Sequence, residues 1–196
     1  MYIIAHSMHK DAISSIYKID KDAATGVINS DNEVDRFSLY IIRLLKIAVK
    51  TPNILTKIGL DKITDCLGYR LIVKSVERVA DHATKIAQTV LQIENKIDKE
   101  IFNKLEELSI FSLEVFEESS KALFKEDYTT SNEIVEKAKS IDKKEIDLTN
   151  LLKNRDVIEQ TNINLIIEHI RRTAEYASDI AEIILNMTAE KFLDKK

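Results

Sequence analysis

Hydrophobic residues recur at helical spacing along almost the whole chain. The clearest stretch covers residues 62–97, where apolar positions are separated alternately by four and three residues. This heptad spacing places the apolar side chains on one stripe of a long helix and favours lengthwise packing in an antiparallel bundle. The stripe consists of Ile72, Val76, Val79, Ala83, Ile86, Val90, Ile93 and Ile97.

The same pattern occurs a second time near the end of the chain. Residues 72–90, IVKSVERVADHATKIAQTV, align without a gap with residues 166–184, IIEHIRRTAEYASDIAEII. A repeat of this length, with apolar and small residues kept in phase, indicates a duplicated helical unit. The polar positions diverge, with Glu77 aligned to Arg171 and Asp81 aligned to Glu175.

The remaining periodicity predicts six helices and an all-α fold. Ser30 and Asp31 are the expected N-cap of the second helix, which ends before Pro52 because the residue preceding a proline disfavours helical geometry. Residues 53–61 form a connection. We therefore predict two tandem three-helix bundles related by the internal repeat, at residues 1–97 and 98–196. The predicted helices cover residues 4–28, 30–49, 62–97, 98–124, 130–153 and 157–192, and the first is either continuous or interrupted near Asp20–Asp22.

Composition narrows the class of protein. The net charge of −4 provides no chain-wide basic field for nucleic acid, and we expect no direct nucleic-acid binding. The single cysteine rules out an internal disulfide and fits a reducing compartment. The N-terminus does not resemble a signal peptide, and no apolar run reaches about 18 residues. These features predict a soluble cytoplasmic helical protein without membrane insertion.

Paired carboxylates are the main candidates for chemistry. Glu77 and Asp81 are one helical turn apart, and Asp31 and Asp35 have the same spacing on a helix expected to pack alongside. Four hard oxygen ligands on adjacent helices suit Mg²⁺, Mn²⁺ or iron, with His82 as a softer ligand nearby. The ordinary alternative is a solvated charged face with surface ion pairs, which contribute about 0–1 kcal/mol and require no function.

A weaker set of acidic residues occurs in the second half. Glu175, Asp179 and Asp147 are its members, but Arg171 brings a cation to the position that Glu77 occupies in the first half. We therefore expect one competent metal site rather than two.

Other chemistries find little support. The chain has no Glu-x-x-His pair of the di-iron bundles, no nucleophile elbow and no glycine-rich phosphate loop. His6 and His9 are expected to be two exposed histidines or an adventitious metal pair, and Cys66 is expected to be a small core residue. We therefore expect that the protein is not an enzyme.

The segment Glu77-Arg78-Val79-Ala80-Asp81-His82-Ala83, followed by Ile86-Ala87, resembles the ERIxDHAxxIA signature of PhoU proteins. Tandem three-helix units that begin with a DxxxD-like helix, here Asp31 and Asp35, are also similar to that family. The resemblance covers nearly the whole chain. Residues 35–60 are similar to archaeal members in particular, in which an AbrB-like DNA-binding domain often precedes the PhoU region; we expect this chain to lack that domain.

The resemblance implies regulation of phosphate uptake and phosphate homeostasis. PhoU proteins are cytoplasmic and restrain an ABC phosphate transporter through its ATPase subunit, and in bacteria they relay its state to a sensor histidine kinase. Several bind multinuclear iron or zinc clusters through paired E/DxxxD motifs, which here implies iron or zinc at the first acidic set, with Mg²⁺ or Mn²⁺ still open.

Two alternatives to this function remain open. One is an accessory protein of a sodium- or proton-coupled phosphate carrier, and the other is a metal-binding helical-bundle enzyme or metal store. We also expect a homo-oligomer, a dimer. Phe111, Phe116 and Leu193 are candidates for the dimer contact, although each fits the core equally well.

Overall fold

Helices make up all the regular secondary structure in the computed structural model, which describes residues 1–153 and 155–193, with side chains up to residue 189. Across these ranges, none of the helices combines the length and the apolar character that crossing a bilayer requires. The helices are α1 (Tyr2–Lys18), α2 (Lys21–Ala48), α3 (Pro52–Lys57), α4 (Asp65–Gln92), α5 (Lys99–Lys125), α6 (Tyr128–Ala138), α7 (Ile141–Leu151) and α8 (Val157–Leu193).

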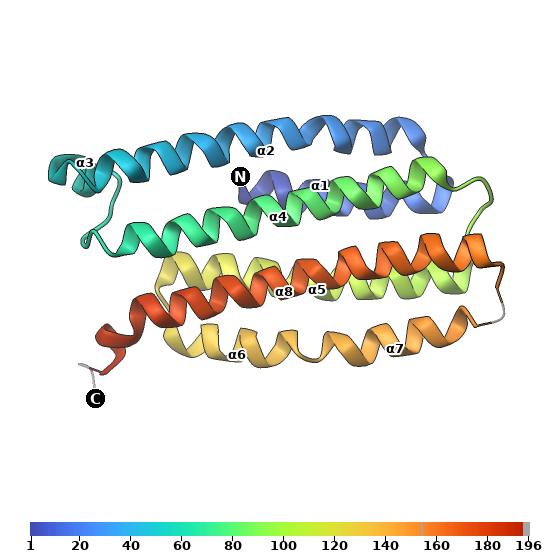
Figure 1. The fold of residues 1–196 in the computed structure, drawn as a ribbon. Coiled ribbons are helices and arrows are strands. Elements are labelled where there is room, and N and C mark those ends of the chain that lie inside the picture. The colour runs from blue at the N-terminus through green and yellow to red at the C-terminus, as the bar shows by residue number, and fades with distance from the viewer. Residues whose placement is uncertain (154, 194–196) are drawn as a thin grey trace.

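The helices form two units that lie side by side, each a bundle of three helical rods, the third rod of the second unit being split into two short helices (Figure 1). The first unit contains α1, α2 and α4, and the second contains α5, α8 and the consecutive short helices α6 and α7. The repeat-related helices α4 and α8 pack against each other between the two units, and α1 also contacts α5. The predicted all-α fold of two tandem repeated bundles is confirmed. The predicted boundary at residues 97 and 98 falls in the connection between α4 and α5.

One hydrophobic core runs through both units. It contains the predicted stripe of α4 and its counterpart on α8, in which Thr173 is buried at the position aligned with Val79. Phe116 is fully buried in this core, which places it in the interior rather than at a dimer contact, and Phe111 packs partly buried against the core. The Leu193 side chain lies outside the described side chains. Because the core is shared, we expect the two halves to unfold together.

The predicted start of the second helix at Ser30 and Asp31 is wrong, because α2 begins nine residues earlier, after the interruption near Asp20–Asp22 that is the predicted alternative for the first helix. Its N-cap is Asp20, whose Oδ1 accepts a 2.9 Å hydrogen bond from the backbone N–H of Ala23. Ser30 lies inside the helix, where its hydroxyl donates to the carbonyl oxygen of Gly26 at 2.9 Å. A serine that bonds to the preceding turn is compatible with the helix interior and does not act as a cap.

The duplication extends to the first connection of each unit, which the sequence comparison missed. Ile19 after α1 and Glu126 after α5 both adopt a left-handed conformation, with φ of 51° and 50°. The following residues, Asp20 and Asp127, cap the next helix by accepting backbone N–H groups three positions on. A left-handed residue followed by an aspartate cap allows the chain to end one helix and begin the next within two residues.

Three other predicted boundaries differ. The helix predicted at 62–97 ends at Gln92, and the connection predicted at 53–61 contains α3, since Pro52 both ends one helix and provides a favourable first residue for another. The helix predicted at 130–153 is interrupted at Lys139–Ser140. There, the Ser140 hydroxyl donates to the carbonyl of Lys137 and competes with the helical pattern.

A small second core lies where α2 ends, α3 follows and α4 begins. It is built from Leu45, Ala48, Leu55, Leu60 and Cys66. Cys66 is buried there, as predicted. This small core fixes the position of residues 45–66 as an extension of the first unit beyond the main bundle.

Candidate functional site

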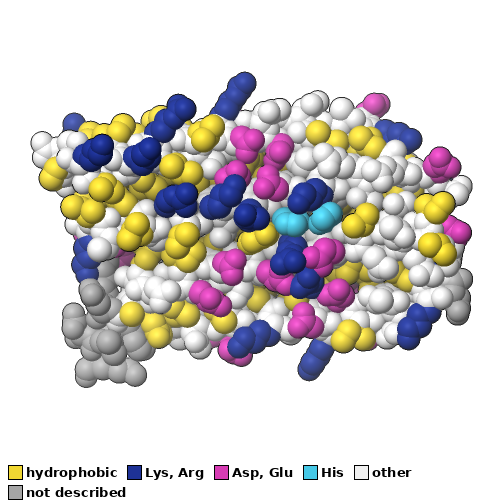
Figure 2. Space-filling model, viewed as in Figure 1, with side chains coloured by type: hydrophobic (Ala, Val, Ile, Leu, Met, Phe, Trp, Pro, Cys, Tyr) yellow, Lys and Arg dark blue, Asp and Glu magenta, His cyan; other side chains and the backbone are white. Residues whose placement is uncertain are grey.

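The four predicted acidic ligands lie on adjacent helices, Asp31 and Asp35 on α2 and Glu77 and Asp81 on α4. Burial raises the pKa of Asp31, and the charges of Asp81, Asp35 and Glu77 raise it further, while a hydroxyl on α4 acts in the opposite sense. The pKa of Asp81 is raised by burial and by Glu77, with Lys74 opposing. The four carboxyl groups are therefore close enough to repel one another, and acidic side chains gather on this part of the surface in Figure 2.

Asp31 is the least satisfied member of this acidic quartet. Its Oδ1 is buried and accepts no hydrogen bond of good geometry; the nearby Oγ1 of Thr84 on α4, which also lacks such a bond, is the hydroxyl that acts to lower the pKa of Asp31. A buried carboxylate oxygen without a partner costs free energy unless a donor or a cation satisfies it. The position therefore favours a positively charged occupant.

Glu77 already has partners. Its Oε1 pairs with the Lys74 ammonium at 2.7 Å, and its Oε2 accepts a 3.0 Å hydrogen bond from Ser38 of α2. Throughout the described ranges, no three His, Cys, Asp or Glu side chains converge closely enough to hold a metal ion. The quartet thus has the donor chemistry of a hard-cation site, but its side chains would have to turn, and Glu77 would have to leave Lys74, to bind one.

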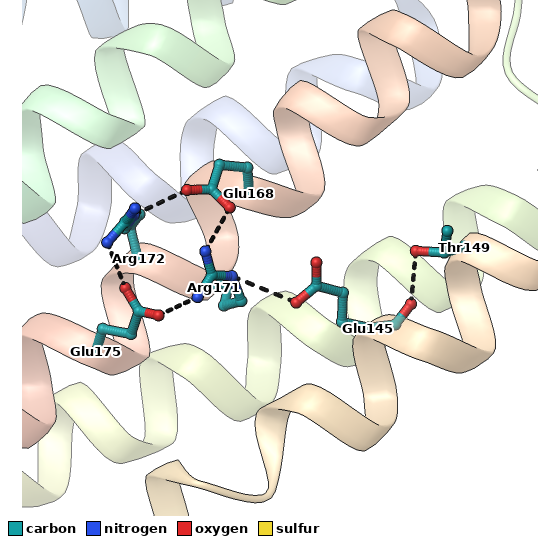
Figure 3. Close-up of polar contacts among 6 residues, drawn as sticks. All are labelled: Glu145, Thr149, Glu168, Arg171, Arg172 and Glu175. Carbon is teal, nitrogen blue, oxygen red and sulfur yellow. Dashed lines mark hydrogen bonds and ion pairs between the residues drawn. The ribbon is translucent and has the colours of Figure 1, made fainter.

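The corresponding part of the second unit is an arginine network (Figure 3). The Arg171 guanidinium bonds to Glu168 at 2.6 Å and to Glu175, both on α8, and its Nε lies 3.3 Å from Glu145 on α7. Arg172 bonds to Glu168 at 2.8 Å and to Glu175 at 2.9 Å. The first unit places carboxylates next to one another at this position, whereas the second unit pairs its carboxylates with arginines.

The weaker predicted set is divided by this network. Glu175 belongs to it, whereas Asp147 and Asp179 are exposed, and neither bonds to the two arginines in the described part of the chain. Partial burial and the charges of Glu182 and Glu175 raise the pKa of Asp179, so Asp179 still lies near Glu175. The Asp147 carboxylate acts electrostatically on Lys104 of α5. Glu145, which the prediction did not include, is the residue that joins α7 to α8 here.

His9 was predicted to be exposed, and this is wrong. It is fully buried, with Nδ1 3.1 Å from the hydroxyl of Thr173 on α8 and Nε2 3.0 Å from the hydroxyl of Ser109 on α5. Burial lowers its pKa to about 3, and the charges of two other histidines contribute. The helical stripe that His9 shares with Ala5, Ala12 and Ile16 was the sequence signal that indicated burial.

His82 contacts α8 through its ring. Its Nδ1 lies 3.0 Å from the Nδ1 of His169, and its ring stacks at a tilt on Tyr176, the residue aligned with it in the repeat. Burial, followed by the charges of His169, Lys85 and Arg172, lowers the pKa of His82 to about 4. In this contact one imidazole donates while the other accepts, so the pair is a neutral link between the two units.

Comparison with known proteins decides the family. Residues 1–90 and 105–184 both match the PhoU domain, so that most of each half is covered. The chain belongs to the PhoU family. The resemblance read from the segment 77–87 is thereby confirmed, while the likeness to archaeal members and the lack of an AbrB-like domain stay predictions.

Individual PhoU proteins align over most of this chain. The phosphate-specific transport system accessory protein PhoU homolog of Borreliella burgdorferi is 26% identical over 186 residues, which cover 89% of this chain and 82% of that protein. The crystal structure of the phosphate transport system regulatory protein PhoU from Streptococcus pneumoniae superposes with a TM-score of 0.79 at 21% identity, covering 94% of this chain and 87% of that chain. The crystal structure of PhoU from Pseudomonas aeruginosa superposes with a TM-score of 0.80 at 15% identity, covering 97% of this chain and 92% of that chain.

Proposed function

We propose that this chain regulates phosphate transport as an accessory protein of a membrane transporter, by contact with the ATPase subunit of an ABC phosphate transporter in the cytoplasm. The observation that carries the proposal is the match of both halves to the PhoU domain, together with a relative named as a phosphate-specific transport system accessory protein. A sensor histidine kinase is a second proposed partner, and a homodimer the proposed assembly.

Deleting the gene should leave phosphate uptake high when phosphate is plentiful, because the proposed regulator restrains the transporter under that condition. A plasmid copy of the gene should lower uptake again. Uptake of radiolabelled phosphate measures this. If the effect persists without the ABC ATPase but disappears when a sodium- or proton-coupled carrier is deleted, the carrier accessory function is correct instead. Unchanged uptake in the deletion strain contradicts both.

We further propose that Asp31, Asp35, Glu77 and Asp81 bind iron or zinc, with Mn²⁺ or Mg²⁺ as alternatives. The mutual repulsion of the four carboxylates and the unpaired buried oxygen of Asp31 support this. A bound cation would supply the missing positive charge. The protein's contribution is to place two carboxylates from α2 beside two from α4, so that occupancy would also tie these helices together.

Asp31→Asn should raise the thermal stability of metal-free protein while abolishing stabilisation by metal. The pKa of Asp31 in the folded protein lies above its ordinary value, so the native state disfavours the charged carboxylate. The free energy of unfolding therefore falls as pH rises from the ordinary pKa of the carboxyl group through its raised value in the folded protein. The relief should appear as a Tm above that of the wild type, at about 2–4 °C for each kcal/mol in a chain of this size. Thermal unfolding with and without added Fe²⁺, Zn²⁺ or Mn²⁺ measures both effects.

Glu33→Gln is the matched control, since it removes an exposed carboxylate from the same helix. It should change neither the metal-free Tm nor the response to metal. A wild-type protein that contains no metal by elemental analysis and shows no metal-dependent shift in Tm refutes the site.

A further inference from the structure

Basic residues are concentrated in one segment of an otherwise acidic chain. Residues 36–74 contain eight Lys and Arg against two Asp, a net charge of +6, whereas the chain as a whole has −4. The same segment carries eight of the sixteen exposed large hydrophobic side chains of the described residues, although it is only a fifth of the chain. Exposed basic side chains and exposed apolar side chains are therefore concentrated in the same segment.

The outer face of α2 provides one part of this surface. Arg36, Tyr40, Arg43, Ile47 and Lys50 follow one another at steps of four, three, four and three residues, which places them on one stripe, and all are exposed. No acidic residue occurs between Arg36 and Lys50. The stripe alternates cations with an aromatic and an aliphatic side chain.

The start of α4 and the connection before it provide the other part. Ile63, Leu67 and Leu71 are 50%, 69% and 51% exposed, and the exposed Arg70 and the partly exposed Lys74 lie beside them on α4. The small core beneath this region holds α2, α3 and α4 together, so the two parts form one ordered end of the molecule. Figure 2 shows basic and hydrophobic side chains gathered over that end.

We propose that this basic-apolar surface, formed by residues 36–74, docks peripherally on an anionic lipid bilayer. Each Lys or Arg near an anionic membrane strengthens binding about fivefold, and exposed aliphatic and aromatic side chains enter the headgroup region. The docking is additional to the proposed contact with a transporter, and its test is independent of phosphate uptake.

Two other occupants fit the surface less well. A symmetric dimer would place the same patch against itself and bring two net charges of +6 together. An amphipathic partner helix requires a deep apolar groove, but the hollow beside Arg43, Lys46 and Lys50 is shallow and is bordered by these three cations. A broad charged surface such as a bilayer satisfies both the cations and the apolar side chains.

Co-sedimentation of the full chain with vesicles tests the proposal. The protein should bind vesicles that contain phosphatidylglycerol, bind less as salt increases, and stay in solution with phosphatidylcholine alone. Arg43→Glu/Lys46→Glu/Lys50→Glu should weaken binding by at least about 100-fold. The control Lys10→Glu/Lys21→Glu/Lys143→Glu changes the net charge equally at exposed positions outside the segment and should retain binding.

Leu67→Ser/Leu71→Ser tests the apolar contribution without altering charge. It should weaken binding by about tenfold or more, because two exposed leucines no longer enter the interface. Circular dichroism confirms that each variant is folded. Equal losses in the two triple variants overturn the proposal, since net charge alone would then explain binding. The absence of any binding to phosphatidylglycerol vesicles also overturns the proposal. The surface would then belong to a contact with an acidic protein, or to a contact with a second copy of this chain if Leu67→Ser/Leu71→Ser converts a dimer to a monomer.

Discussion

Lowering the pH from 7 to 4 should decrease the free energy of unfolding by about 3 kcal/mol through His9 alone. The unfolded chain protonates this imidazole near its ordinary pKa, whereas burial lowers the folded-state pKa to about 3. The contribution of neutral His9 to the free energy of unfolding is therefore fully present above the pKa of the unfolded state. It is lost as pH falls toward the lower pKa of the folded state. Its size follows from about 1.4 kcal/mol for each unit of pKa shift.

Urea unfolding at a series of pH values measures this loss. His9→Gln should lower stability at neutral pH, because Gln reproduces the bonds to Thr173 and Ser109 imperfectly, and should remove about half of the pH dependence that the buried histidines cause, since the pKa of His82 is also lowered, to about 4. His82 and His169, whose pKa values are also lowered by burial, contribute to the remaining slope with the same sign, whereas carboxyl groups with raised pKa values, such as Asp31, oppose it. Ser14→Ala, at an exposed position of the same helix that carries no titratable group, is the control and should leave the slope unchanged. A His9→Gln protein with the wild-type pH dependence would show that the buried imidazole does not control acid stability.

Arg171→Glu should destabilise the protein by about 2–4 kcal/mol at neutral pH. The substitution removes the cation that pairs with Glu145, Glu168 and Glu175 and adds a fourth carboxylate among them. The loss is smaller than for a fully buried pair because the Arg171 side chain is 21% exposed and its partners are more exposed still. Urea unfolding in the presence of a chelator measures it.

Arg172→Glu is the matched control for this substitution. Arg172 bonds to the same two glutamates of α8, but its side chain is 42% exposed and only Arg171 pairs with Glu145 of α7. The control should therefore cost less than half as much. Equal losses would show that the link from α8 to α7 adds nothing. Because Arg171→Glu also recreates the acidic pattern of the first unit, added Fe²⁺ or Zn²⁺ should restore part of its stability.

The two halves of this protein solve the same electrostatic problem differently. In the first unit, carboxylates face one another and Asp31 keeps a buried oxygen without a partner. In the second, Arg171 neutralises the glutamates around it. The substitution of Glu77 by Arg171 between the repeats therefore changes the role of the position from a candidate cation ligand to an internal counter-ion.

The helical class and the buried stripe of α4 followed from the sequence, because each depends on residues within a few turns of one another, and the duplication followed from aligning residues 72–90 with residues 166–184. The spacing of Glu77 and Asp81 is local in the same way. Helix starts were predicted less well. Ser30 and Asp31 resembled a cap, but Asp20 caps α2, because side-chain bonds within a helix and at its start draw on the same residue types.

The tertiary structure alone decided which of these groups meet. The bond of His9 to Thr173 joins residues 164 positions apart, and the pair of His82 with His169 joins residues 87 positions apart. Glu145 became the partner of Arg171 only through the packing of α7 on α8. Sequence by itself determined the helices and the stripe that each one buries, since periodicity is a property of the chain. The pairs within α8 follow from spacings of three and four residues, but the contacts between helices were decided by packing, because those partners are not sequence neighbours.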